Sequence, residues 1–142
     1  MTTVEGERRF DAPPQRVYEL LTDPEVIASA IPAVQGHEVI DVDHWQAKVK
    51  PPLRFAPGVT IRFEVLDRRP PEHARLHAHG GGADVTSTFD LVADEGGTLM
   101  RWRTDLELAG LLARFAGHGL DGIAERQAVR TLDAVERRLG RP

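Results

Sequence analysis

The segment LLTDPEVIASAIPAV, from Leu20 to Val34, contains two prolines eight residues apart with apolar side chains before and between them. Pro24 ends a first helix, because the residue before a proline is driven out of the helical region. Asp23 suits the N-cap of a second helix with Pro24 at its first position, and Pro32 stops that helix after about two turns. The segment therefore predicts two short helices that bend the chain.

The residues on both sides of this segment predict strands. Thr2 to Asp11 alternates between apolar and charged side chains, and Pro13 and Pro14 suit the entry to the first helix. From Gly36 onward the pattern again has period two, which predicts six further strands separated by Asp, Pro and Gly turns. These strands are 37–42, 44–50, 58–67, 72–80, 83–92 and 98–108. Consecutive antiparallel pairing with one apolar face is the simplest arrangement.

The stretch from Gly110 to Gly140 carries the longest helical pattern, with apolar residues three and four positions apart. Such a helix would span roughly 40 Å and cover the apolar face of the sheet. Gly117, Gly119 and Gly122 each disfavour a helix interior by up to about 1 kcal/mol. Two interpretations stay open here. Either the helix begins only near Leu120, or small residues leave room between helix and sheet.

The elements together predict a single α+β domain over residues 1–142: a curled, seven-stranded antiparallel sheet, two short helices after the first strand and a long C-terminal helix. A strongly twisted sheet curls, so a straight helix touches it along a line and space remains beside the contact. The two short helices would then form a lid over the mouth of an apolar groove.

Composition restricts the function classes. The net charge is −4 and the arginines are scattered except near the C-terminus, so no basic face for nucleic acid is predicted. The sequence has no cysteine, which excludes disulfides and thiolate metal sites. No apolar run is long enough for a signal peptide or a membrane span. We expect a soluble cytoplasmic protein with at most peripheral contact at the inner face of a membrane.

The order of elements resembles the helix-grip fold of the START and birch-pollen-allergen superfamily, also called SRPBCC. GERRFDAPPQRVYELLTDPEVIASAIPAV resembles the opening of proteins in the family of the carbon monoxide dehydrogenase G subunit, which run from an Ala-Pro-Pro helix through Asp-Pro-Glu to Ile-Pro-Gly-Val. GGTLMRWRTDLELAGLLARFAG resembles a later part of the same family. Three features depart from the family pattern. Ala33 replaces a glycine, the turn 50–58 is rich in proline, and the sequence ends at Pro142 without the tail of some members.

This resemblance implies a protein that binds an apolar molecule, such as a quinone or a lipid, beside a large molybdenum-containing hydroxylase. The cofactors would belong to that partner, and none is expected in this chain. The wider superfamily includes polyketide cyclases and aromatases, so an enzyme that uses the same cavity is the alternative. A third hypothesis is an assembly protein whose sheet surface docks a larger enzyme.

The candidate ligand-binding residues are those on predicted inward faces. Arg8 shares the face of Val4 and Phe10, so it is predicted either to bind a ligand carboxylate or carbonyl or to turn to solvent at the strand end. The expected pocket wall consists of Trp45, Phe63, Phe89, Met100, Trp102, Leu112, Phe115, Ala116, Gly119, Leu120 and Ile123. Val26, Ile27 and Ile31 are the expected lid residues.

No residue pattern predicts catalysis or a metal site. Ser29 and Ser87 are the only serines, and neither lies in a Gly-x-Ser-x-Gly motif. His77 and His79 share one face of a strand, but alternation places them outward and Leu76 and Ala78 inward. We therefore predict no catalytic residue and no metal ligand.

Overall fold

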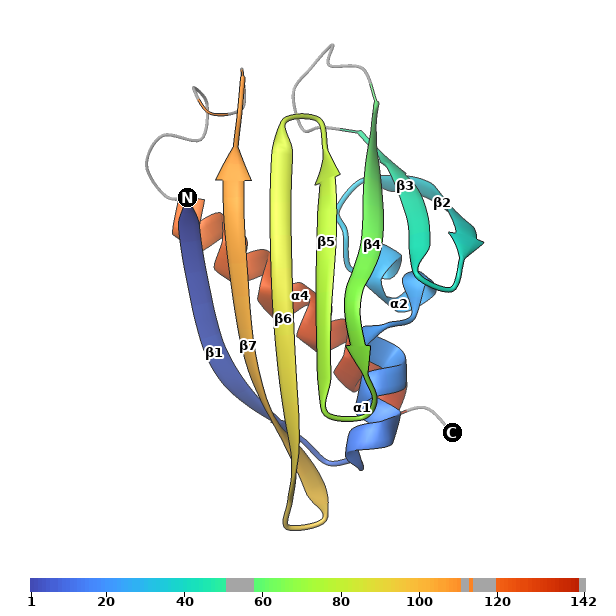
Figure 1. Cartoon of the computed structure of the whole chain (residues 1–142), viewed down its shortest axis with the longest axis vertical. Helices are drawn as coiled ribbons and strands as arrows, with labels where there is room; N and C mark the ends of the chain where they lie inside the picture. The colour runs from blue at the N-terminus through green and yellow to red at the C-terminus, as the bar shows by residue number, and fades with distance from the viewer. Residues whose placement is uncertain (51–57, 111–112, 114–119, 141–142) are drawn as a thin grey trace.

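The computed structural model describes residues 1–50, 58–110, 113 and 120–140 (Figure 1). The strands are β1 (Thr2–Phe10), β2 (Val34–Asp41), β3 (His44–Val49), β4 (Val59–Arg69), β5 (His73–Gly80), β6 (Ala83–Asp94) and β7 (Gly97–Leu108). The helices are α1 (Pro14–Leu21), α2 (Pro24–Ser29) and α4 (Leu120–Leu139). All seven predicted strands and both short helices are thus confirmed.

The strands form one antiparallel sheet in the order β1-β7-β6-β5-β4-β3-β2. From β2 to β7 each strand pairs with the next one in sequence, which confirms the predicted meander. β1 pairs with β7, from Thr2 opposite Leu106 to Phe10 opposite Thr98, so the first strand joins the last. The free edges are therefore β1 and β2.

Local chemistry at the two prolines produces the bend between α1 and α2. The Asp23 carboxylate accepts a hydrogen bond from the backbone N–H of Glu25 at 3.0 Å, and Pro24 is the first residue of α2. This is the predicted N-cap, which satisfies a donor that the new helix leaves free. Val17, Leu20 and Leu21 on α1 are all buried, as their spacing predicted.

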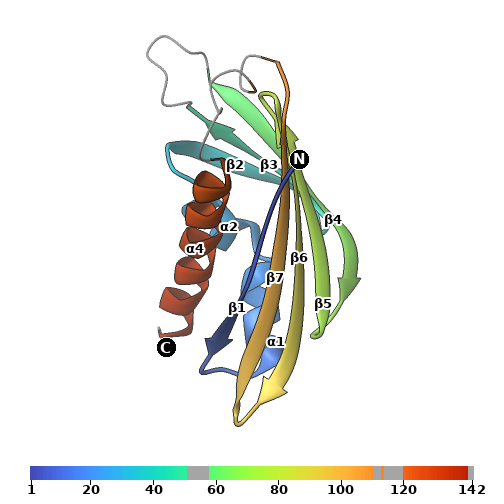
Figure 2. The same cartoon turned by 90° about the vertical axis from the view of Figure 1, so that its left-hand side faces the viewer.

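The three helices lie on the same side of the sheet (Figure 2). α4 crosses that side diagonally, contacting β1, β7, α1 and α2 (Figure 1). Residues 111–112 and 114–119 lie outside the described part of the chain. The two interpretations of the glycines before Leu120 therefore stay predictions. We call the sheet face toward these helices the inner face and the opposite one the outer face.

Buried residues on the inner face form two separate clusters. The larger one contains residues of α1, of the last three turns of α4, and of the ends of β1, β5, β6 and β7 that lie nearest α1. Its members include Phe10, Leu21, Ala74, Leu91, Met100 and Leu132. The smaller one consists of Ile27, Ala28, Trp45 and Ala47, with Val34 and Phe63 packed against it. We call the larger cluster the closed half. Among the described residues, the buried side chains on the apolar face of the sheet therefore form two clusters rather than one.

Ala33, at the position where the resemblance led us to expect glycine, has a left-handed backbone conformation with φ of 60°. Its carbonyl accepts a hydrogen bond from the backbone N–H of Lys50 at 3.1 Å, at the pairing of β2 with β3. A β-carbon is unfavourable in this conformation. Glycine would be the unstrained residue here, so the departure from the family pattern has a physical cost.

Candidate functional site

A group of inner-face residues between the two clusters is only partly buried. We call this group the open half; it consists of Ile61, Phe63, Leu76, Ala78, Val85, Ser87 and Thr104, from β4 to β7. Sheet register brings them together: Phe63 lies opposite Ala78, and Leu76 opposite Ser87. Side chains at such positions are normally buried in the core of a domain this size. Leu76 packs against the larger cluster and Phe63 against the smaller one, yet both stay partly exposed. The open half is therefore an apolar surface that the rest of the described chain does not fully cover.

α2 connects the two clusters and borders the open half. Val26 is fully buried in the closed half, whereas Ile27 belongs to the smaller cluster. There Trp45 stacks on Phe63 with ring centroids 3.8 Å apart and an angle of 5° between the planes. The two predicted lid residues thus anchor α2 to both clusters. That α2 acts as a lid stays a prediction.

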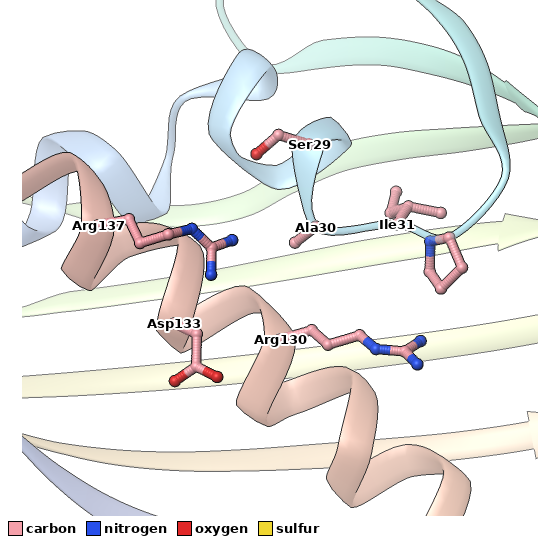
Figure 3. Close-up of a pocket in the computed structure, with 7 residues that line it drawn as sticks. Ser29, Ala30, Ile31, Arg130, Asp133 and Arg137 are labelled. Atoms are coloured by element: carbon pink, nitrogen blue, oxygen red, sulfur yellow. The ribbon is translucent and has the colours of Figure 1, made fainter.

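A pocket of about 300 Å³ lies between α4 and the end of α2 (Figure 3). Its lining includes the predicted lid residue Ile31, and Figure 3 shows that the strands run behind it. The lining residues are Ser29, Ala30, Ile31, Pro32, Arg130, Asp133 and Arg137. Gln127 Nε2 donates to the Ala30 carbonyl at 3.1 Å, which ties α4 to the end of α2 beside this pocket.

Arg8 is an inner-face residue whose charge is balanced by α4. Its guanidinium lies 2.8 Å from an Asp133 carboxylate oxygen and 2.7 Å from one of Glu136, and the Arg8 side chain is 21% exposed. The prediction that it turns to solvent at the strand end does not describe this position. A charge on this apolar face requires a partner, and two carboxylates of α4 provide it. These contacts hold α4 against β1. A contact from Arg8 to a ligand stays a prediction.

The other predicted wall residues are divided between the two clusters. Phe89, Met100 and Trp102 belong to the closed half, and the Trp102 indole lies against Gly6, where a β-carbon would be 2.8 Å from Cζ2. Ile123 is 48% exposed, in contrast to its predicted inward direction. Its neighbour Ala124 is 5% exposed, so Ile123 lies on the side of α4 that faces away from the packed residues. Leu120 is the first residue of α4. Leu112, Phe115, Ala116 and Gly119 lie outside the described residues.

His44 on β3 and His73 and His77 on β5 contact carboxylates on the outer face. His73 lies 2.7 Å from Asp90, and His77 lies 2.9 Å from Asp84, which confirms its predicted outward direction. The Asp41 carboxylate, 2.7 Å from His44 Nδ1, raises the pKa of His44, and this hydrogen bond lowers the pKa of Asp41. Over the described residues, no group of three or more His, Cys, Asp or Glu side chains has a geometry that could hold a metal ion.

A second pocket, of about 480 Å³, lies at the outer face over β1, β6 and β7. Acidic and basic side chains alternate around it, and Arg101 Nε donates to the Glu7 carboxylate at 3.0 Å. Its lining residues are Glu5, Gly6, Glu7, Thr88, Asp90, Arg101, Trp102 and Arg103. Arg103 pairs with Asp105 and Asp90 with His73, so charged groups dominate this pocket and its chemistry does not fit an apolar molecule.

Sequence reasoning did not single out Ser87 and Thr104, although a signal was present. Ser87 is two residues before the buried Phe89, and Thr104 is two residues after the buried Trp102. Each is therefore a polar residue at an apolar position of its strand. Sequence reasoning also did not predict that Ser29 of α2 and Arg130 and Arg137 of α4 line one pocket. No local pattern relates α2 to a helix about 100 residues later in the sequence.

The family model for the G subunit of carbon monoxide dehydrogenase (CoxG) matches residues 6–140. The chain belongs to this family. No curated protein matches the sequence of this family member. Solved structures show that the CoxG-family chain has the START and birch-pollen-allergen type of fold predicted from its sequence, because they superpose over almost its whole length at low sequence identity.

Three of these structures illustrate the likeness. A conserved protein from Geobacillus kaustophilus is 19% identical, with a TM-score of 0.82, and the match covers 96% of this chain and 94% of that one. A START superfamily protein from Mycobacterium smegmatis is 14% identical, with a TM-score of 0.73 and coverage of 96% and 95%. Ara h 8.0201 is 14% identical, with a TM-score of 0.72 and coverage of 95% of both chains.

Among the helices of the described residues, none combines the length and the apolar character that crossing a membrane requires. α4 illustrates this, since its exposed residues include the charged Glu125, Arg126 and Arg130.

Proposed function

We propose that this CoxG-family protein binds an apolar small molecule, such as a lipid, a quinone or a polyketide-like compound, against the open half of its inner face. The observation that carries the proposal is the division of the core into two clusters with partly buried apolar side chains between them. Burial of apolar surface contributes about 25 cal/mol per Å², so a ligand that covers these side chains gains free energy without chemical change.

The proposed role is non-catalytic. The histidine–carboxylate contacts of β3 and β5 lie on the outer face, on the opposite side of the sheet from the open half. Arg8 is the charged inner-face residue of β1, and two carboxylates of α4 already balance its charge. General acid–base catalysis requires a titratable group within hydrogen-bond reach of the substrate, and the described open half offers only hydroxyl groups.

Native mass spectrometry of the protein purified from cells tests the proposal. We expect a species heavier than the bare chain, whose extra mass is released on denaturation and identifies the bound molecule. Ala78→Trp should abolish this species, because the indole would fill the open half. Val92→Trp is the matched control, since Val92 lies on the outer face of the same sheet and is 64% exposed. The proposal is wrong if the wild type carries no ligand and binds no apolar probe.

The family suggests a partner as well. We propose that the protein delivers its ligand to, or receives it from, a large molybdenum hydroxylase of the carbon monoxide dehydrogenase type. Support comes from the match of residues 6–140 to a family described as a subunit of that enzyme. Sedimentation velocity of the chain mixed with such a hydroxylase from the same organism should show a faster component that contains both proteins. Independent sedimentation of the two would contradict this partnership.

A further inference from the structure

A pair of hydroxyl groups interrupts the apolar inner face at the β6–β7 side of the open half. Ser87 on β6 and Thr104 on β7 are opposite one another in the sheet, and their hydroxyl oxygens lie 3.1 Å apart. Both residues are partly buried. Their inner-face neighbours along the two strands are apolar, namely Val85 and Phe89 on β6 and Trp102 and Leu106 on β7. The pair is thus a polar point on an apolar surface.

Counting hydrogens shows what this pair can do. Each hydroxyl has one hydrogen to donate and two lone pairs that accept. Whichever oxygen donates to the other, the accepting hydroxyl keeps its own hydrogen. Within the described residues, the Ser87 and Thr104 hydroxyls hydrogen-bond only to one another. The pair therefore retains one O–H donor for a further partner.

The surroundings restrict the chemistry of that partner. The residues opposite the pair on the adjoining strands are Leu76 on β5 and Val4 on β1, both apolar. No described inner-face residue next to the pair along or across the strands carries a charge that could balance an anion. A ligand that covers the pair must accept the spare hydrogen or leave a donor unpaired in apolar surroundings, which is unfavourable. An uncharged oxygen acceptor fits both conditions.

We infer that Ser87 and Thr104 form the polar anchor of the binding site and hydrogen-bond to a carbonyl oxygen on an otherwise apolar ligand. This inference rests on the proposed function and specifies the ligand class, which is a neutral molecule with a carbonyl group rather than a pure hydrocarbon or an acid. Apolar pockets typically contain a few such groups, which orient the ligand while burial supplies the affinity.

Two probes of nearly equal shape test the anchor: 2-acetylnaphthalene, which has a carbonyl, and 2-ethylnaphthalene, which has a methylene in its place. The measured quantity is the ratio of their dissociation constants, because this ratio cancels the apolar contribution that both share. We expect the double variant Ser87→Ala/Thr104→Val to reduce the preference for the ketone about five-fold relative to wild type, the effect of one net hydrogen bond.

The single variants give a sharper test than the double variant alone. In Ser87→Ala the Thr104 hydroxyl keeps its hydrogen, and in Thr104→Val the Ser87 hydroxyl does. Each single variant should therefore keep most of the preference for the ketone. Thr86→Val is the control, since Thr86 is the neighbour of Ser87 on the outer face and should leave the ratio unchanged. Thermal unfolding followed by circular dichroism confirms that all four variants fold.

Infrared spectroscopy of the bound ketone provides a second readout. A hydrogen bond from the anchor lowers the carbonyl stretching frequency, so the frequency should be lower in wild type than in the double variant. An unchanged ratio and frequency in a double variant that binds both probes would overturn the anchor and leave the proposed function intact. Failure of the wild type to bind either probe would overturn both.

Discussion

The closed half and the open half of the inner face contain the same kinds of residue but pack differently. In the closed half, Ala74 and Met100 are completely buried, and Leu91 is 3% exposed. In the open half, Leu76 and Ala78 continue the same strand as Ala74 yet are only partly buried. The same period-two pattern therefore produces packed core at one end of a strand and accessible surface at the other. The difference arises from what covers each end.

Helix placement explains the difference. α1 and the last three turns of α4 lie over the closed half, where Val17, Leu21, Leu132 and Val135 are buried against the sheet. α4 crosses the sheet diagonally, so its axis does not follow the middle strands toward the β5–β6 turn (Figure 1). A straight helix packed on a twisted sheet covers only the side chains along one diagonal of that sheet. The open half lies off that diagonal.

Matched leucine truncations should reveal the largest contrast between the two halves. Leu91→Ala should lower the free energy of unfolding by about 3 kcal/mol, because the closed half cannot collapse around the cavity. Leu76→Ala should lower it by about 1 kcal/mol, since part of that side chain already contacts solvent. Urea unfolding measures both. Equal losses would show that the two halves are packed equally tightly.

Enlarged alanines on one strand give the next largest effect. Ala74→Leu should lower the free energy of unfolding by about 2 kcal/mol, because Ala74 has no exposed surface and no space for a larger side chain. Ala78→Leu, four residues along the same face, should cost less than about 0.5 kcal/mol, because Ala78 is partly exposed and the added atoms can extend toward solvent. Chemical unfolding of both variants decides the matter, and a large cost at Ala78 would contradict an open half.

Replacing Ala33 by glycine should stabilise the protein at the start of β2, next to the smaller cluster. Ala33 has a φ of 60° directly before Val34, which packs against that cluster. Ala33→Gly should raise the free energy of unfolding by about 1 kcal/mol, because the strain of the β-carbon disappears. Ala93→Gly is the control and should lose up to about 1 kcal/mol, as glycine does in a strand with ordinary dihedral angles. A loss at position 33 would show that the left-handed conformation is not strained.

The smallest effect should come from His44 on the outer face, which belongs to neither half. Asp41 raises the pKa of His44 above its ordinary value of 6.5, so the contact stabilises the fold fully below that value. This stabilisation is lost as pH rises through the raised pKa. Comparing His44→Gln with wild type by thermal unfolding should show the difference at pH 6 and not at pH 9. A difference independent of pH would exclude protonation of His44 as its source.

The comparison of the halves also shows where sequence reasoning works. Alternation along β3 and β4 predicted that Trp45 and Phe63 face inward, and they stack on one another. The prolines and Asp23 predicted α1 and α2, because caps and helix stops depend on neighbouring residues only. The sequence could not predict that Met100 is fully buried and Phe63 only partly buried, since both residues occupy inward positions of the same alternating pattern.

Arg8 and Ser87 show what period-two reasoning misses. Arg8 is on the inner face as predicted, but its partners Asp133 and Glu136 are more than 120 residues away in the sequence. The Ser87–Thr104 pair depends on the register of β6 against β7. Local patterns carry no information about which distant residues meet, because pairing depends on how the whole chain closes.

The sequence by itself determined the seven strands, the two short helices, the helical pattern at the C-terminus and the family, because these depend on spacing and on local backbone preferences. Only the tertiary structure decided that β1 joins β7, that Arg8 fastens α4, and that the core divides into two clusters. The β1–β7 pairing follows from how the sheet closes, and the other two features follow from the angle at which α4 crosses that sheet (Figure 1). That angle depends on the packing of the whole molecule.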